Sequence, residues 1–276
     1  MARIVVIGDV CKDVFIYGQC KRLSPEAPVP VFNPIEKTVN EGMAGNVVAN
    51  LRAINPYLEV EFFRNLDEIT KTRYVDKNTN HLFLRVDDEP RINRIWFTNE
   101  MMSLISDADA VVVSDYNKGF LTEEDIQFIS TKARWCILDS KKQLTPSIIS
   151  NYSFIKLNES EYKANKDALT YLNKKVIVTL GSKGAEYMND IYPSPDPKET
   201  IDVSGAGDTF LAAFTIKYLA DVKALMAQSN IDKTRIDNLE RLVYQQSNPI
   251  NTFYPSSIRP VAILPKNEFE TKKEGK

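Results

Sequence analysis

The amino-acid sequence predicts an α/β fold, in which helices pack on a mostly parallel sheet. Two patterns support this prediction: short apolar runs bounded by turn residues, and segments of helical periodicity between them. The apolar runs are Ile4–Ile7, Ala110–Ser114, Trp135–Leu138, Phe154–Leu157 and Val176–Leu180. The helical segments are Ala44–Ile54, Thr122–Lys132, Ser160–Leu172 and Asp208–Leu219. Strands that alternate with helices favour right-handed crossovers.

Each apolar run is short and continuous, which is typical of strands that are buried on both faces of a parallel sheet. Leu58–Phe63 is a further expected strand after the first helix. The segment from Thr122 opens with a Thr-Glu-Glu cap signal. The segment from Asp208 follows a turn of small residues, so we expect a helix to begin there.

Two stretches interrupt this alternation. Val14–Val39 is rich in proline and has no helical period, whereas Thr70–Asp87 is typical of a hairpin with a polar turn. We interpret both as strands of a small antiparallel sheet, inserted into the body at about residues 14–39 and 70–87. The chain is therefore predicted to form one domain over residues 1–265, followed by a polar tail over residues 266–276.

Composition excludes several classes of partner. Among 276 residues the net charge is −2, which indicates neither nucleic acid nor an anionic membrane as the main partner. No apolar run is long enough for a membrane span or a signal segment. The three cysteines are odd in number and lack metal-ligand spacing. We therefore expect a soluble cytoplasmic protein with reduced thiols.

The chain has a single histidine, His81, beside the predicted hairpin turn. A Ser-His-Asp hydrolase, a Cys-His protease or a multi-histidine zinc enzyme would have to be built around that residue. No Gly-x-x-x-x-Gly-Lys-Ser/Thr motif occurs, which excludes a P-loop route to ATP.

The most informative segment is Asp202–Phe210, in which small residues lead into an apolar helix. Gly205, Ala206 and Gly207 leave backbone N–H groups uncovered at the helix start, where the helix dipole also favours anions. Asp208 lies beside these donors and could accept a proton from a hydroxyl group. An acidic helix cap with glycines for close packing explains the same residues, and the segment alone leaves both interpretations open.

The residues Asp202–Asp208 match the Asp-x-x-Gly-Ala-Gly-Asp signature, so the chain resembles the ribokinase-like (PfkB) carbohydrate kinases. Seven other segments resemble the kinase domain that phosphorylates heptose 7-phosphate in ADP-heptose synthesis. They are residues 8–13, 17–18, 22–31, 44–47, 70–73, 84–87 and 114–119. The resemblance implies a three-layer α/β/α body with an antiparallel lid, and Mg²⁺ and ATP as cofactors.

The resemblance also implies roles for individual residues. Asp208 would be the general base, and Gly205, Ala206 and Gly207 the anion hole. The residues implied at the sugar or sugar phosphate are Asp9, Asp13, Asn46, Arg73, Arg85, Asp115 and Lys118. Those implied at the nucleotide are Asn158, Glu161, Ser182, Gly184 and Ser204. Mg²⁺ would be held through water by Asn158 and Glu161 without direct protein ligands, and a monovalent cation could lie near Asp202.

Several of these assignments have a plainer alternative. Asp9 and Asp13 could be strand-end or cap residues, and Asn158 with Glu161 could be a helix cap with a surface acid. Lys118 and Arg85 could be ordinary solvated charges.

The chain departs from the family pattern in two places. Residues 64–68 lead directly into Thr70, where the family has a further strand and helix. The segment 221–249, which would shape the adenine pocket, is polar. Ser140 also stands where the heptose enzymes have proline.

The function expected from the sequence is transfer of the ATP γ-phosphoryl group to a sugar hydroxyl, with a heptose 7-phosphate-like acceptor. A kinase of another sugar or nucleoside remains an alternative, as does a catalytically lapsed relative that binds sugar phosphate. Apolar residues in the two lid segments predict a homodimer through the lid.

Overall fold

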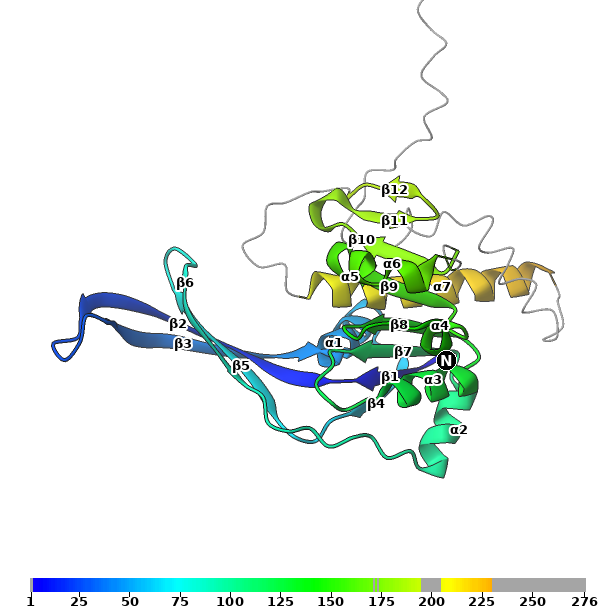
Figure 1. Cartoon of the computed structure of the whole chain (residues 1–276), viewed down its shortest axis with the longest axis horizontal. Helices are drawn as coiled ribbons and strands as arrows, with labels where there is room; N and C mark the ends of the chain where they lie inside the picture. The colour runs from blue at the N-terminus through cyan, green and yellow to red at the C-terminus, as the bar shows by residue number, and fades with distance from the viewer. Residues whose placement is uncertain (1, 171, 173, 195–204, 230–276) are drawn as a thin grey trace, which may run out of the picture.

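The computed structural model describes residues 2–170, 172, 174–194 and 205–229, with side chains up to residue 224 (Figure 1). Asp202, Ser204, most of the segment 221–249 and the tail 266–276 lie outside the described residues. The described part forms an α/β body from which a long second sheet projects. No helix in this part is long and apolar enough to cross a membrane.

The body contains a sheet of eight strands in the order β12-β11-β10-β9-β8-β7-β1-β4. These strands are β1 (Arg3–Gly8), β4 (Glu59–Arg64), β7 (Ala110–Asp115), β8 (Cys136–Ser140), β9 (Phe154–Asn158), β10 (Val176–Thr179), β11 (Ala185–Tyr187) and β12 (Asp190–Tyr192). The six strands from β4 to β10 are parallel, and β11 and β12 add an antiparallel edge. The predicted parallel sheet is therefore confirmed.

Helices cover both faces of this sheet. They are α1 (Ala44–Ile54), α2 (Asn99–Asp107), α3 (Glu123–Lys132), α4 (Pro146–Ile149), α5 (Glu159–Ala164), α6 (Lys166–Leu169) and α7 (Ala206–Ser229), with a 3₁₀ turn η1 at Gly181–Lys183. Ile4 and Val6 of β1 belong to the core cluster that contains α1 and α7 residues, whereas Val5 and Ile7 belong to the opposite cluster. This alternation of side chains creates two cores and confirms the three-layer body.

The lid sheet has four strands in the order β3-β2-β5-β6. They are β2 (Val10–Leu23), β3 (Pro30–Met43), β5 (Ile69–Asp76) and β6 (Leu82–Asp88). The two hairpins β2–β3 and β5–β6 are antiparallel as predicted, but β2 pairs with β5 in parallel. The lid is therefore two antiparallel hairpins joined in a mixed sheet, because a long connection through the body separates β2 from β5.

The lid strands extend further toward the body than residues 14–39 and 70–87 suggested. β2 begins one residue after β1, with Asp9 between them, and β3 ends at Met43, immediately before α1. Four residues separate β4 from β5, in agreement with the shortened connection expected from the sequence. The lid is consequently attached to the body beside Asp9 and Asn46.

One predicted helix is broken in the structure. The segment expected as Ser160–Leu172 forms α5 and α6, which are separated at Asn165. The buried Asn165 side chain accepts a hydrogen bond from the Leu144 N–H at 2.7 Å and donates one to the Glu161 carbonyl at 2.8 Å. An asparagine amide that binds the backbone competes with helix continuation, which the periodicity of apolar residues does not reveal. The short helix α2 was not predicted.

Candidate active site

The candidate site lies at the carboxyl ends of the parallel strands, where ligands of open α/β sheets usually bind. Asp9 follows β1, and Asp115 ends β7. Asp139 lies near the end of β8, and Asn158 ends β9. Helix α7 begins near the same edge, because its Asp208 contacts the residue that follows β7. Polar residues far apart in the sequence therefore meet at one edge of the sheet.

Asp208 is in the first turn of α7 and is only 3% exposed. Its Oδ1 accepts a hydrogen bond from the Tyr116 hydroxyl at 2.8 Å, and its Oδ2 accepts one from the Asn46 amide at 3.0 Å. Burial raises the pKa of Asp208, and the two hydrogen bonds oppose part of that increase. The carboxylate is therefore oriented by two donors and is more basic than an ordinary aspartate.

The small residues before Asp208 allow close approach by neighbouring side chains. Gly205 has a φ of +84°, and a Cβ at this position would lie 2.5 Å from the Asn46 amide nitrogen. A Cβ on Gly207 would lie 2.8 Å from Lys156 Nζ. Ala206 begins α7, whose first N–H groups lack partners within the helix. The segment predicted as an anion hole is therefore a helix start that has the Lys156 side chain beside it.

The lysine in that contact was missed by the sequence analysis. Lys156 Nζ is 2.5 Å from Asp139 Oδ2, and each side chain is 4% exposed. Asp139 Oδ1 is buried and has no hydrogen-bond partner among the described residues. A lysine inside the apolar run Phe154–Leu157 is a signal that could have identified it, because buried lysines are almost always paired.

Asp9 is fully buried between the lid and the body. Its Oδ2 accepts hydrogen bonds from the backbone N–H groups of Tyr116 and Lys118, at 2.7 and 3.3 Å. Its Oδ1 has no partner among the described residues. Burial raises the pKa of Asp9, and nearby Asp115 raises it further. One buried oxygen of Asp9 therefore has unused hydrogen-bonding capacity among the described residues.

Asp115, in contrast, is engaged by the protein. It accepts hydrogen bonds from the Ser140 hydroxyl at 2.5 Å and from Lys142 Nζ at 2.8 Å, and it is 1% exposed. The sequence-predicted contact of Asp115 with sugar phosphate therefore competes with an existing structural network. Ser140 helps to hold that network.

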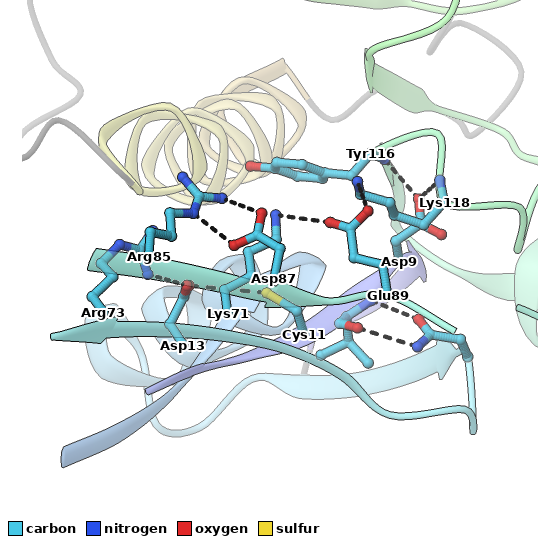
Figure 2. A network of polar contacts seen from close by, with 12 residues as sticks. Asp9, Cys11, Asp13, Lys71, Arg73, Arg85, Asp87, Glu89, Tyr116 and Lys118 are labelled. Carbon is cyan, nitrogen blue, oxygen red and sulfur yellow. Dashed lines mark hydrogen bonds and ion pairs between the residues drawn. The ribbon is translucent and has the colours of Figure 1, made fainter. Parts of the chain in front are cut away.

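The inner face of the lid carries alternating cations and carboxylates (Figure 2). Arg73 lies 2.6 Å from Asp13, and its guanidinium stands 4.9 Å from the Phe15 ring centroid. Arg85 makes two hydrogen bonds with Asp87, at 2.7 and 2.9 Å. Glu89 lies 2.6 Å from Lys118 and 4.0 Å from Lys71. Lys118, Arg73 and Arg85 are thus brought to one region, but each is paired with a carboxylate.

Asn158 and Glu161 form a reciprocal capping box at the start of α5. The Asn158 side chain accepts from the Glu161 N–H at 2.9 Å, and the Glu161 carboxylate accepts from the Asn158 N–H at 2.8 Å. Glu161 also forms an ion pair with Lys141. Both residues therefore have the helix-cap role that sequence analysis left open, and only part of their hydrogen-bonding capacity remains.

Ser182 and Gly184 lie in the turn between β10 and β11. Because β10 is the neighbour of β9, with Thr179 paired to Asn158, this turn follows the strand next to the capping box. Gly184 has a φ of +98°. No group of three or more His, Cys, Asp or Glu side chains suitable for a metal occurs among the described residues.

Residues 70–229 match the model of the pfkB family carbohydrate kinases. This match covers more than half of the chain. The chain belongs to the pfkB carbohydrate kinase family. The resemblance identified from the sequence motifs is therefore confirmed.

Curated relatives and solved structures agree with this family. The chain is 31% identical to the bifunctional protein HldE of Sulfurimonas denitrificans, covering 76% of this chain and 55% of the relative. It is 32% identical to HldE of Helicobacter pylori strain J99, covering 79% of this chain and 58% of the relative. The chain thus spans little more than half the length of these relatives.

Two solved structures share the fold. Ribokinase of Arabidopsis thaliana, complexed with ribose and ATP, matches with a TM-score of 0.56 and 14% identity, over 80% of this chain and 87% of that chain. Phosphofructokinase-2 of Escherichia coli, in complex with fructose-6-phosphate, matches with a TM-score of 0.59 and 14% identity, over 80% and 88%. At these identities the likeness establishes a ribokinase-like fold.

Proposed function

We propose that the chain transfers the γ-phosphoryl group of ATP to a hydroxyl of a phosphorylated sugar such as heptose 7-phosphate. The observation that carries this proposal is the position of Asp208, a buried carboxylate beside the N-terminus of α7. A base next to uncovered N–H groups suits phosphoryl transfer, which depends on positioning and charge stabilisation. The seven sequence segments that resemble heptose 7-phosphate kinases support a heptose acceptor.

In this mechanism Asp208 accepts the proton of the attacking hydroxyl. Asn46 and Tyr116 hold the carboxylate, each through one oxygen, and each oxygen keeps a lone pair for the acceptor. The N–H groups of Gly205, Ala206 and Gly207 stabilise negative charge on the transferring group. Lys156 adds a positive charge beside Gly207.

For the acceptor sugar, we assign hydroxyl binding to Asp9, Asp13 and Asn46. The free buried oxygen of Asp9 supports this role, because an unpaired buried oxygen is stabilised by a hydroxyl donor. We assign the acceptor phosphate to Arg73 and Arg85 on the lid, together with Lys118 in the loop after β7. Asp115 is assigned to the support of this region through Lys142.

For the nucleotide, we assign ATP binding to Asn158, Glu161, Ser182, Gly184 and Ser204. Glu161 and Asn158 present oxygen atoms of the kind that bind hydrated Mg²⁺, and their mutual hydrogen bonds suit contact through water better than direct ligation. Mg²⁺ bound with ATP would neutralise phosphate charge. A monovalent cation near Asp202 belongs to the same proposal.

A second candidate is a kinase of an unphosphorylated sugar or a nucleoside. It is favoured by the pairing of Arg73, Arg85 and Lys118 with carboxylates, since a phosphate must compete with those partners. A lapsed relative that only binds sugar phosphate is the third outcome. The tests below separate these three.

We further propose a cytoplasmic homodimer with one kinase domain over residues 1–265. Three free cysteines support a reducing compartment. Exposed apolar residues on the lid, including Leu84 and Val86, support association through that sheet.

The direct test measures ATP consumption with heptose 7-phosphate, ribose, fructose phosphates and nucleosides, alongside Asp208→Asn. We expect heptose 7-phosphate to be preferred and the variant to lose roughly a hundredfold or more in kcat, with ATP affinity nearly unchanged. If the variant keeps more than about a tenth of the rate, Asp208 is not the base. Sugar-phosphate binding without turnover by the wild type would identify a lapsed enzyme.

A further inference from the structure

Tyr116 connects two carboxylates that belong to different elements. It follows β7 directly, and its backbone N–H donates to Asp9 at 2.7 Å. Its hydroxyl donates to Asp208 Oδ1 at 2.8 Å, and Figure 2 shows the ring extending from the Asp9 side toward the start of α7. Lys141 Nζ stands 5.4 Å from the ring centroid. Tyr116 therefore contacts both Asp9, which is proposed to bind the sugar, and Asp208, which is proposed to be the base.

The Tyr116 contact differs from that of an ordinary buried tyrosine. Tyr152 is fully buried and satisfies its hydroxyl with the backbone carbonyl of Ile126 at 2.9 Å. A backbone carbonyl is enough to satisfy the hydroxyl of a tyrosine that is buried only for packing. Tyr116 instead donates to an ionisable side chain 92 positions away in the sequence. The next residue, Asn117, has a φ of +57°, so the backbone turns sharply where the ring is directed toward α7.

The two donors on Asp208 restrict its carboxylate plane. Asn46 binds Oδ2 from α1, and Tyr116 binds Oδ1 from the loop after β7. Two donors on different oxygens prevent rotation about the Cβ–Cγ bond more effectively than one. We propose that Tyr116 is a positioning residue, which fixes the Asp208 carboxylate for the acceptor hydroxyl and stabilises its charged form. This inference rests on the proposed role of Asp208 as the base.

Several other charged groups act on Asp208. Asp139 at the end of β8 raises its pKa, and Lys156 on β9 lowers it. Asp208 also interacts electrostatically with Lys141, in the loop after β8, and with Cys11 on β2. Burial is the largest contribution and raises the pKa, whereas the bonds from Asn46 and Tyr116 lower it. All these groups except the phenol remain in a Tyr116→Phe variant.

The phenol is a reliable donor over the working pH range. Burial, followed by the charge of Asp208, raises the pKa of Tyr116 well above its ordinary value. The proton therefore stays on Tyr116 when Asp208 is charged, and no proton passes between them. Loss of the phenol removes a contribution that lowers the pKa of Asp208, so Asp208 should stay protonated to a higher pH.

The first test compares the pH dependence of kcat for the wild type, Tyr116→Phe and the control Tyr152→Phe. We expect Tyr116→Phe to move the acid limb of the profile upward by about one pH unit and to lower kcat at pH 7 by roughly tenfold. The KM for ATP should change by less than about twofold. Tyr152→Phe should leave the acid limb in place, whatever it does to thermal stability.

The second test needs no substrate. Aspartate labelled with ¹³C at Cγ is titrated by NMR, and the Asp208 signal is assigned from its absence in Asp208→Asn. Tyr116→Phe should raise the midpoint of this signal, while Tyr152→Phe should not. An unchanged midpoint in a folded Tyr116→Phe variant overturns the proposal.

The two tests also separate this inference from the proposed function. One outcome is that Asp208→Asn remains active while Tyr116→Phe still raises the NMR midpoint of Asp208. In that case the hydrogen bond between Tyr116 and Asp208 exists, but Asp208 is not the general base. If kcat falls in Tyr116→Phe with neither the acid limb nor the midpoint displaced, the residue has only a packing role, which also overturns the proposal.

Discussion

Lys156 occupies the space that a side chain on Gly207 would need. The Lys156 ammonium is buried with Asp139, and a Cβ placed on Gly207 would lie 2.8 Å from its Nζ. Glycine at this position therefore leaves space for a positive charge immediately beside the first turn of α7. A fixed charge in a buried site stabilises a transferring phosphoryl group more strongly than one in water.

Gly207→Ala should lower activity more than stability. In a helix this change normally stabilises by about 0.5–1 kcal/mol, but displacing the buried, ion-paired Lys156 ammonium outweighs that gain, so the temperature of thermal unfolding should fall. The added methyl group displaces the Lys156 ammonium, and kcat should fall by at least about tenfold. Thermal denaturation and steady-state kinetics measure the two effects.

A double-mutant cycle checks the cause of that loss. It is carried out in an Asp139→Asn background, so that removal of Lys156 leaves no unpaired buried carboxylate. Gly207→Ala should cost little further activity once Lys156→Met is present, because the displaced group is gone. Additive losses would show that Gly207 acts without Lys156.

Met43 has an unusual backbone conformation for a residue with a side chain. Its φ is 57° and its ψ is −134°, immediately before α1, and the side chain is 4% exposed. Such conformations cost about 1–3 kcal/mol in residues other than glycine. Met43→Gly and Met43→Ala both remove the buried side chain, but only glycine relieves this strain.

We therefore expect Met43→Gly to be more stable than Met43→Ala by about 1 kcal/mol in urea denaturation, after allowance for the greater freedom of unfolded glycine. The matched comparison is Ala53→Gly, on the exposed face of α1, which should destabilise by about 0.5–1 kcal/mol. Equal or greater stability of Met43→Ala would contradict the strain argument.

Lys118→Ala tests whether the acceptor already carries a phosphate. Lys118 Nζ lies 2.6 Å from Glu89, and the Lys118 backbone N–H donates to Asp9 Oδ2, so a phosphate would exchange with Glu89 for the ammonium. The acceptor KM should rise far more than the ATP KM. Lys163→Ala, an exposed lysine on α5, should change neither constant. Equal wild-type activity on the sugar with and without its phosphate would reject a phosphorylated acceptor.

The lid should form a homodimer interface. Phe32 packs on Tyr74 and on Phe83 within the chain, with ring centroids 5.3 and 5.8 Å apart, respectively. Leu84 and Val86 remain 54% and 45% exposed on the edge strand β6. Apolar residues on an unpaired edge favour pairing with a second copy.

Light scattering at micromolar concentration should therefore give about twice the 31.4 kDa chain mass. Leu84→Glu should shift the protein toward monomer, because it places a charge on the edge strand. Ile191→Glu is the control, since Ile191 is 64% exposed on β12 of the body. A fully active monomeric wild type would show that the lid covers the active site of its own chain and is not a dimer interface.

From the sequence alone, the parallel-stranded body could be predicted, and the Gly-Ala-Gly-Asp segment at the start of α7 could be proposed as an anion site. Continuous apolar runs specify buried parallel strands, because a strand covered on both faces must be apolar throughout. Gly205, Ala206 and Gly207 before Asp208 indicate an anion site through local geometry, since the backbone of a helix start is exposed there. The short connection between β4 and β5 could also be predicted from the sequence, because its length depends only on the number of residues.

Tertiary structure decided which groups surround Asp208. Tyr116 reaches it because β7 and α7 meet at one edge of the sheet, and Lys156 lies beside Asp139 because β9 is the neighbour of β8. Strand order, which no local pattern encodes, determines both contacts. Local patterns also do not encode the parallel pairing of β2 with β5. The same holds for the carboxylate partners of Arg73 and Lys118. Such contacts join residues that are distant in sequence, and their energies depend on burial that only the folded chain creates.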